Sequence, residues 1–131
     1  MASLPTPSSF PLAKRGSTKW LSVRQEDEIA RRFAGKRSLS SGGSVTDQGD
    51  VRTAKLLIEC KHRGTFDKPA RSVSIKLDDF EKIADEAWSE GRQPVMALRI
   101  YCPDSVLSDE DGNVDIIARL IDDDRKGRYA E

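Results

Sequence analysis

The chain is poor in the residues that build disulfide frameworks and zinc sites. Its 131 residues include two cysteines, Cys60 and Cys102, and one histidine, His62. This set is too small for the usual four-ligand zinc site, and nothing in the sequence indicates a secreted domain. We expect Cys60 to pack in the core as a small hydrophobic residue. His62 could contact phosphate or act as a base, but a lone histidine is more often incidental.

The chain also lacks a net charge and a long apolar run. No apolar run approaches the ~20 residues that span a membrane, so we expect an intracellular, cytoplasmic protein without a membrane partner. Basic and acidic residues number 22 each, which argues against bulk attraction to nucleic acid. Basic residues nevertheless predominate from Lys14 to Arg37 and could form a local DNA-binding surface. Acidic residues predominate beyond Asp104, most simply as a solvated face.

Composition divides the chain into one domain and two tails. Residues 1–19 are rich in proline and serine and predict a flexible N-terminal arm. Residues 20–121 carry the periodic segments and predict a single domain, and residues 122–131 form a charged C-terminal tail. A core of this size is near the lower limit for a stable domain, so dimerisation would help to stabilise it.

A group of charged residues surrounds one short apolar segment, 56–61, which predicts a buried strand. Side chains two residues apart lie on the same face of a strand, so Leu57, Glu59 and Lys61 share one face. Asp50 can join them from the preceding strand or bend. The sequence therefore predicts two carboxylates and one ammonium at the point where a buried strand opens into a site.

This combination suits metal-assisted cleavage of a phosphodiester bond. Mg²⁺ prefers hard oxygen ligands, so the carboxylates of Asp50 and Glu59, a backbone carbonyl and phosphate oxygens would complete its shell. Such an ion can polarise the phosphate and lower the pKa of an attacking water. Lys61 would orient that water or neutralise charge developing on the phosphate.

A helix is predicted before this group, over residues 22–33, with Ser22 as its N-cap and acidic residues in its first turn. Helical spacing places Glu26 on the apolar face with Ile29, whereas Glu28 points away. A carboxylate on the inward face needs a partner. The simpler alternative is that these acidic residues complement the helix dipole.

The segment 35–44 joins this helix to the charged group and combines basic residues with glycine and serine. Its backbone N–H groups could approach phosphates while Lys36 and Arg37 supply charge. It could equally be a plain flexible loop.

The segments after the charged group predict an α/β domain with a central mixed sheet flanked by helices. Residues 71–76 alternate like a strand, and residues 77–88 carry apolar residues at helical spacing with Gly91 as the stop. Residues 94–100 predict a second buried strand. Residues 114–121 could form a strand or a short helix, and we favour a strand.

The set Asp50, Glu59 and Lys61 resembles the PD-(D/E)xK nuclease superfamily, in which an acid is followed by Glu or Asp, any residue and Lys. Gly49 stands where the superfamily's proline would be. The resemblance implies a restriction-endonuclease-like core, whose order is helix, two or three strands, helix, strand. From about residue 24 to residue 100 the chain is most similar to phage-type Holliday junction resolvases, relatives of the archaeal resolvases. The segments carrying this closer likeness are Glu26, Gly35-Lys36-Arg37, Ser41-Gly42, Gly49-Asp50-Val51, Leu57-Ile58-Glu59-Cys60-Lys61, Ser74-Ile75-Lys76 and 94–100.

The resemblance implies a metal-dependent, structure-specific endodeoxyribonuclease that resolves four-way DNA junctions. Its cofactor would be Mg²⁺, for which Mn²⁺ can substitute, and its origin a phage within a bacterial host. Metal binding and catalysis are carried onto Glu26, Asp50 and Glu59, and catalysis also onto Lys61, with Glu28 as the fallback for Glu26. DNA contacts are carried onto Lys36, Arg37, Ser41 and Lys76. Cutting two opposing strands needs two active sites, which implies a homodimer joined through the second helix or the late strands.

Two alternatives remain open. The chain could be another endonuclease on the same core, of the nicking, repair or restriction-like kind. It could also be a catalytically silent DNA-binding protein on this fold, although the intact set of Asp50, Glu59 and Lys61 argues against silence. The two tails and the neutral net charge depart from the family pattern.

Overall fold

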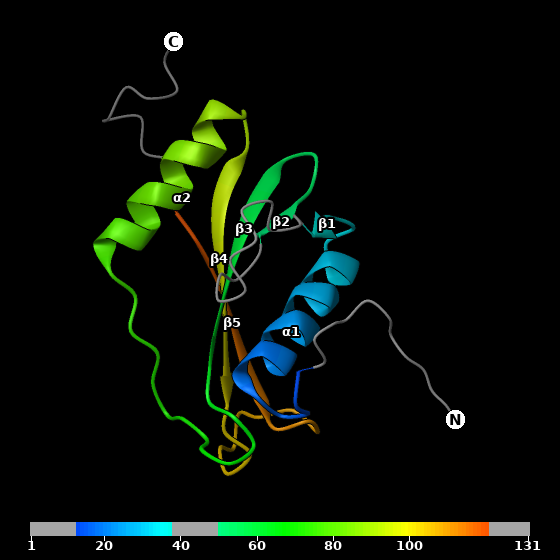
Figure 1. Ribbon diagram of the computed structural model, residues 1–131. Helices are drawn as coiled ribbons and strands as arrows, with labels where there is room; N and C mark the ends of the chain where they lie inside the picture. The colour runs from blue at the N-terminus through cyan, green and yellow to red at the C-terminus, as the bar shows by residue number, and fades with distance from the viewer. Residues whose placement is uncertain (1–12, 38–49, 121–131) are drawn as a thin grey trace.

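The computed structural model describes residues 13–37 and 50–120, which form an α/β domain with a five-stranded mixed sheet and two helices (Figure 1). In chain order the elements are α1 (Thr18–Arg32), β1 (Lys36–Arg37), β2 (Asp50–Arg52), β3 (Leu56–Arg63), α2 (Leu77–Ser89), β4 (Gln93–Tyr101) and β5 (Asn113–Arg119). The predicted α/β class and mixed sheet are confirmed. None of the helices in these ranges is long and apolar enough to cross a membrane.

The strands lie in the order β1-β2-β3-β4-β5. The central strands β3 and β4 are parallel, and the other neighbours are antiparallel. Parallel neighbours need a crossover connection, which α2 supplies. The predicted strands over 94–100 and 114–121 are confirmed as β4 and β5, and the helix expected over 77–88 is confirmed as α2. Gly91, with φ of 73°, follows its end.

Each helix covers one face of the sheet, and the alternation of β3 and β4 divides their side chains between two cores. On the α1 face, Ile29 packs with Val51, Ile58, Cys60, Val95 and Ala97. On the α2 face, Ile83 and Ala87 pack with Leu57, Met96 and Leu98. Each fully buried aliphatic side chain contributes about 1.5–3 kcal/mol to folding. Cys60 is a core residue as predicted.

The first helix begins earlier than the sequence predicted. Ser17, rather than Ser22, is its N-cap, and the Ser17 Oγ accepts a hydrogen bond from the Trp20 backbone N–H at 3.3 Å. Ser22 is buried inside the helix, and no acidic residue lies in the first turn. The additional turn is stabilised from outside, because the Trp20 ring packs edge-on against Phe66 at 5.8 Å between ring centroids. Such a contact is invisible to local capping rules.

The predicted strand over residues 71–76 is wrong. This segment is irregular, although Val73 and Ile75 are half-buried against the core on the α2 face. The place beside β3 is taken by β4, so the segment has no strand to pair with. Its alternation reflects side-chain burial without sheet hydrogen bonds.

Polar side chains fasten α1 to the sheet near His62. The Gln25 Nε2 donates a hydrogen bond to the Ala97 carbonyl at 3.1 Å, and Arg99 bonds both Asp115 and Glu28. His62 is 1% exposed, and its ring nitrogens bond to no described residue. Burial and the charge of Arg99 lower the pKa of His62 to about 4.

We expect the buried neutral His62 to make stability fall in mild acid. The unfolded chain takes up a proton below the ordinary pKa of 6.5, whereas the folded chain does not until about 4. Because the unfolded state binds this proton more readily, the folded state has its full stability above pH 6.5 and loses part of it as the pH falls toward 4. In urea unfolding, the stability of the wild type relative to His62→Phe should drop by about 2 kcal/mol between pH 7.5 and pH 5. A relative stability that does not change with pH would contradict this account of His62.

Candidate functional site

The register between β2 and β3 brings the predicted carboxylates together. Asp50 lies directly opposite Glu59, so both side chains are on the same face of the sheet, the face that α2 covers. Lys61 follows on that face, with its Nζ 3.6 Å from the Glu59 Oε2. All three side chains are partly exposed, from 19% to 26%. The structure therefore assembles the predicted trio at one place, within reach of solvent.

The two carboxylates interact strongly. Burial, followed by hydrogen bonding to Asp50 and repulsion from its charge, raises the pKa of Glu59 to about 8, although Lys61 opposes the shift. Burial and the neighbouring Asp50 therefore favour the protonated form of Glu59. A cation that binds both carboxylates would replace that proton.

A further acid, Asp79, joins the site from the first turn of α2. Its Oδ2 lies 3.9 Å from the Lys61 Nζ and accepts a hydrogen bond from the Lys76 backbone N–H at 3.3 Å. Lys61 thus lies between Glu59 and Asp79. The sequence analysis gave Asp79 no role in the site, because no local pattern connects the start of this helix to Lys61. The predicted DNA contact Lys76 adjoins the site through Asp79.

Glu26 lies on the other side of the sheet. It is 4% exposed, and Arg37 forms ion pairs with both Glu26, at 3.1 Å, and Asp27. Burial raises the pKa of the Cys60 thiol, and the charges of Glu26, Glu59 and Asp50 raise it further. Glu26 therefore lies near Cys60, between α1 and β3.

Within ranges 13–37 and 50–120, no three acidic, histidine or cysteine side chains form a group that could hold a metal.

The remaining predicted residues lie on both faces of the sheet, apart from one that is outside the described residues. Glu28, the fallback for Glu26, pairs with Arg99 at 2.8 Å and Arg24 at 3.6 Å. Lys36 lies opposite Arg52 in the sheet and so faces the same side as Asp50. Ser41 lies outside the described residues.

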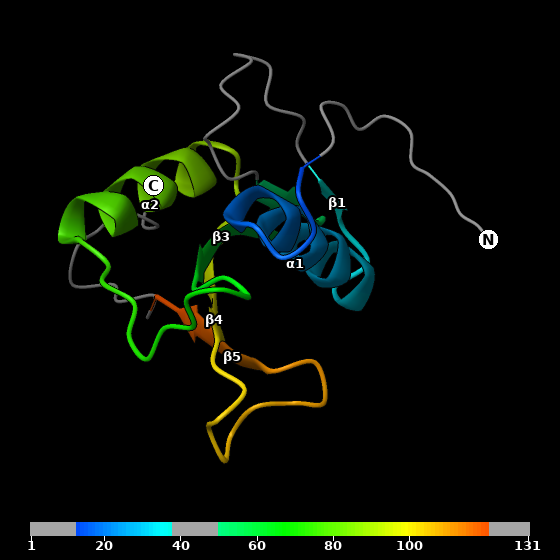
Figure 2. The ribbon, with the colours of Figure 1, turned by 60° about the horizontal axis from the view of Figure 1, so that its bottom comes forward.

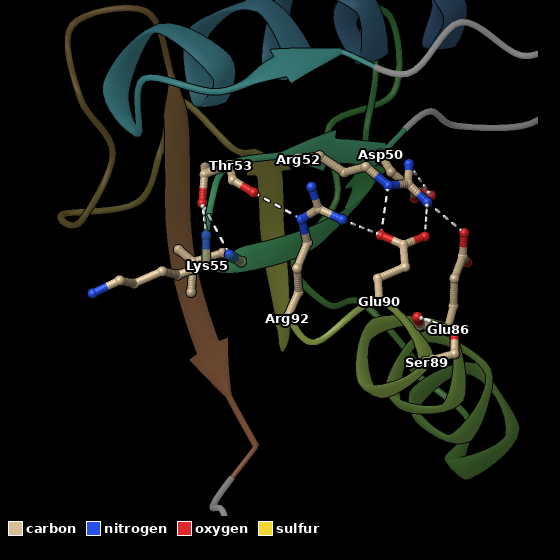
Figure 3. Close-up of polar contacts among 9 residues, drawn as sticks. Asp50, Arg52, Thr53, Lys55, Glu86, Ser89, Glu90 and Arg92 are labelled. Carbon is tan, nitrogen blue, oxygen red and sulfur yellow. Dashed lines mark hydrogen bonds and ion pairs between the residues drawn. The ribbon is translucent and has the colours of Figure 1, made fainter.

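A network of charges beside Asp50 fastens β2 to the end of α2 (Figure 3). The Arg52 Nη2 lies 2.6 Å from Glu86 and 2.8 Å from Glu90, and its Nη1 lies 3.9 Å from the Asp50 Oδ2. Hydrogen bonding to Arg52 lowers the pKa of Glu90 to about 2, so this carboxylate stays ionised. The guanidinium of Arg52 is therefore held mainly by α2.

The network continues to the turn between β2 and β3. Arg92 donates one hydrogen bond to Glu90 at 2.6 Å and another to the Thr53 carbonyl at 2.8 Å. The Thr53 Oγ1 in turn accepts hydrogen bonds from the backbone of Lys55 and Leu56. These contacts fix the short strand that carries Asp50 relative to α2.

Comparison with protein-family models, with curated proteins and with solved structures finds no match for the chain.

If the acidic pair is a metal site, Mg²⁺ binding should release a proton and strengthen as the pH rises from 6 to 8, because Glu59 must ionise. Isothermal titration calorimetry in buffers of different ionisation enthalpy measures both effects without DNA. Asp50→Asn and Glu59→Gln should abolish binding. Glu110→Gln, at an exposed acid in the β4–β5 turn, should not. Binding that is retained in Glu59→Gln would contradict the assignment.

The charge network should protect the acidic pair from Arg52. In the double variant Glu86→Gln and Glu90→Gln, Arg52 loses its strong partners on α2 and turns toward Asp50. We expect Mg²⁺ affinity, measured by the same calorimetry, to fall roughly two- to fivefold. Glu81→Gln, at an exposed acid elsewhere on α2, is the control. An unchanged affinity in the double variant would show that the network has no effect on the pair.

Proposed function

We propose that this protein is a metal-dependent, structure-specific endodeoxyribonuclease of the PD-(D/E)xK kind that resolves four-way DNA junctions. The observation that carries the proposal is the pairing of Asp50 with Glu59 across β2 and β3, with Lys61 beside them on the same face. The order of α1, three strands, α2 and β4 agrees with the core implied by the resemblance. Fold and site are thus consistent with one function.

The acidic pair fits a magnesium ion. Mg²⁺ in phosphoryl-transfer sites is commonly held by one or two carboxylates together with substrate phosphate and water, so Asp50 and Glu59 suffice. The raised pKa of Glu59 supports this choice, because burial and the neighbouring Asp50 both disfavour its negative charge and a bound cation would stabilise that charge. Bound there, the ion would polarise the phosphate and acidify a water molecule. Glu26 could contribute only after its ion pair with Arg37 rearranged.

Lys61 is placed to act on the reacting groups. Its ammonium lies between Glu59 and Asp79, which limits the positions that its flexible side chain can adopt. From there it can orient the attacking water and stabilise negative charge that develops on the phosphate. In-line attack forms a new bond from water oxygen to phosphorus and breaks the bond to the 3′ oxygen, leaving a 5′-phosphate.

Exposed basic side chains near the site supply a surface for the DNA backbone. Lys36 faces the same side of the sheet as Asp50 and Glu59, and Lys76 adjoins Asp79 at the start of α2. Contacts from such side chains to phosphates position DNA without reading its sequence. This property suits an enzyme that selects the shape of a junction.

Cleavage assays on labelled four-way junction, duplex and single-stranded DNA, each with Mg²⁺ or EDTA, test the proposal. We expect paired, Mg²⁺-dependent nicks near the branch point, with duplex DNA spared. Asp50→Asn and Glu59→Gln should abolish cleavage but preserve or tighten junction binding, because a metal ligand and a negative charge near phosphate are lost. Glu110→Gln should cut like the wild type.

The other outcomes separate the alternatives. Cutting of all three substrates would retain the nuclease site and favour a nicking, repair or restriction-like enzyme. Binding without metal-dependent cutting would favour a catalytically silent DNA-binding protein. Cleavage that survives in both variants would contradict the site.

A further inference from the structure

The last strand, β5, forms an edge of the described sheet. Its one neighbour there is β4, and both helices pack on other strands (Figure 2). The strand is seven residues long, pairs with β4 in continuous register, and contains neither proline nor glycine. Its centre carries two isoleucines, Ile116 and Ile117, which are 45% and 37% exposed. Exposed edges of this length are usually covered, because their unpaired N–H and C=O groups can add another strand.

The hydrogen bonds at the start of β5 show which backbone groups face outward. The Cys102 N–H donates to the Gly112 carbonyl, so these two residues point toward each other. The next residue, Asn113, instead exchanges hydrogen bonds with Asp109, so its backbone points away from β4. Antiparallel pairs alternate between these two arrangements. The backbone groups of Asp115, Ile117 and Arg119 therefore face outward.

The outward residues are complementary to a second copy of themselves. Asp115 and Arg119 lie equally far from Ile117 on either side. In an antiparallel pair centred on Ile117, Asp115 lies opposite the partner's Arg119, and Ile117 lies opposite the partner's Ile117. The residues that meet are also those whose backbone groups face outward, so each pair can exchange two hydrogen bonds.

We propose that β5 is a homodimer interface in which two copies pair antiparallel, edge to edge, about a two-fold axis at Ile117. On the α2 face this register places Ile116 opposite the partner's Ala118, so each exposed isoleucine gains an apolar neighbour from the partner strand. Arg119 is exposed and gains the partner's Asp115 as an ion-pair partner. Asp115 keeps its bonds to Arg99, at 2.7 and 2.9 Å, which hold the carboxylate in place.

A strand from a different protein could use the same backbone groups, but the side chains favour a second copy. A second copy of β5 necessarily carries an arginine, an apolar residue and an acid at the matching alternate positions, whereas an unrelated strand carries them only by coincidence. The purpose of such a dimer rests on the proposed function, because paired cutting of a junction needs two active sites.

Sedimentation equilibrium of the full chain, without DNA or metal, tests the interface. We expect a dimer whose dissociation constant rises at least about tenfold in Arg119→Glu, because this change places like charges opposite each other twice. Arg31→Glu, an equal charge reversal at an exposed position on α1, should leave it unchanged. A monomeric wild type, or equal effects of the two variants, would overturn the proposal.

Crosslinking tests the register. Cys60 and Cys102 are buried, so a cysteine introduced at the surface should be the reactive one. A short bismaleimide should join two copies through Ile117→Cys much faster than through Val106→Cys, which lies in the β4–β5 connection and is 97% exposed in the native residue. Equal rates would overturn the proposed axis. A dimer that cuts no DNA would uphold the interface while refuting the nuclease function, and a monomer that nicks junctions would do the reverse.

Discussion

The pairing of Asp50 with Glu59 is the interaction on which the candidate site depends. Two carboxylates lie opposite each other because β2 and β3 are antiparallel in this register, and a slip of one residue would send one of them to the other face. Burial, together with the hydrogen bond to Asp50 and the repulsion from its charge, raises the pKa of Glu59 to about 8. The Arg52 network keeps β2 in place, and Asp79 restrains Lys61. The surrounding charges thus maintain an acidic pair that a divalent cation would relieve.

The sequence predicted the features of the site that depend on strand alternation and helical periodicity. Glu59 and Lys61 share a face with Leu57 because they lie on one strand, and Glu26 is inward because it follows the apolar face of α1. It could not predict what depends on distant partners. Ser22 is inside a helix extended by the packing of Trp20 on Phe66, and residues 71–76 alternate beside a position that β4 occupies. The role of Asp79 requires knowing where α2 lies against β3.

The sheet also separates carboxylates that the family resemblance groups together. Asp50 and Glu59 face α2, whereas Glu26 lies under α1 with Arg37 as its partner. Glu26 could therefore join the pair on the strands only after its ion pair with Arg37 rearranged. The edge strand β5 lies on the far side of β4 from this site, so a dimer formed there would leave both acidic pairs accessible to DNA.

The pKa of Glu59 tests the central claim most directly. A pH titration of its side-chain carboxyl carbon by NMR should give a value near 8 in the wild type. The value should fall toward the ordinary 4.5 in Asp50→Asn, and also when Mg²⁺ is added to the wild type. Titration near 4.5 in the wild type without metal would show that neither burial nor Asp50 disfavours the charge of Glu59 and would contradict this account.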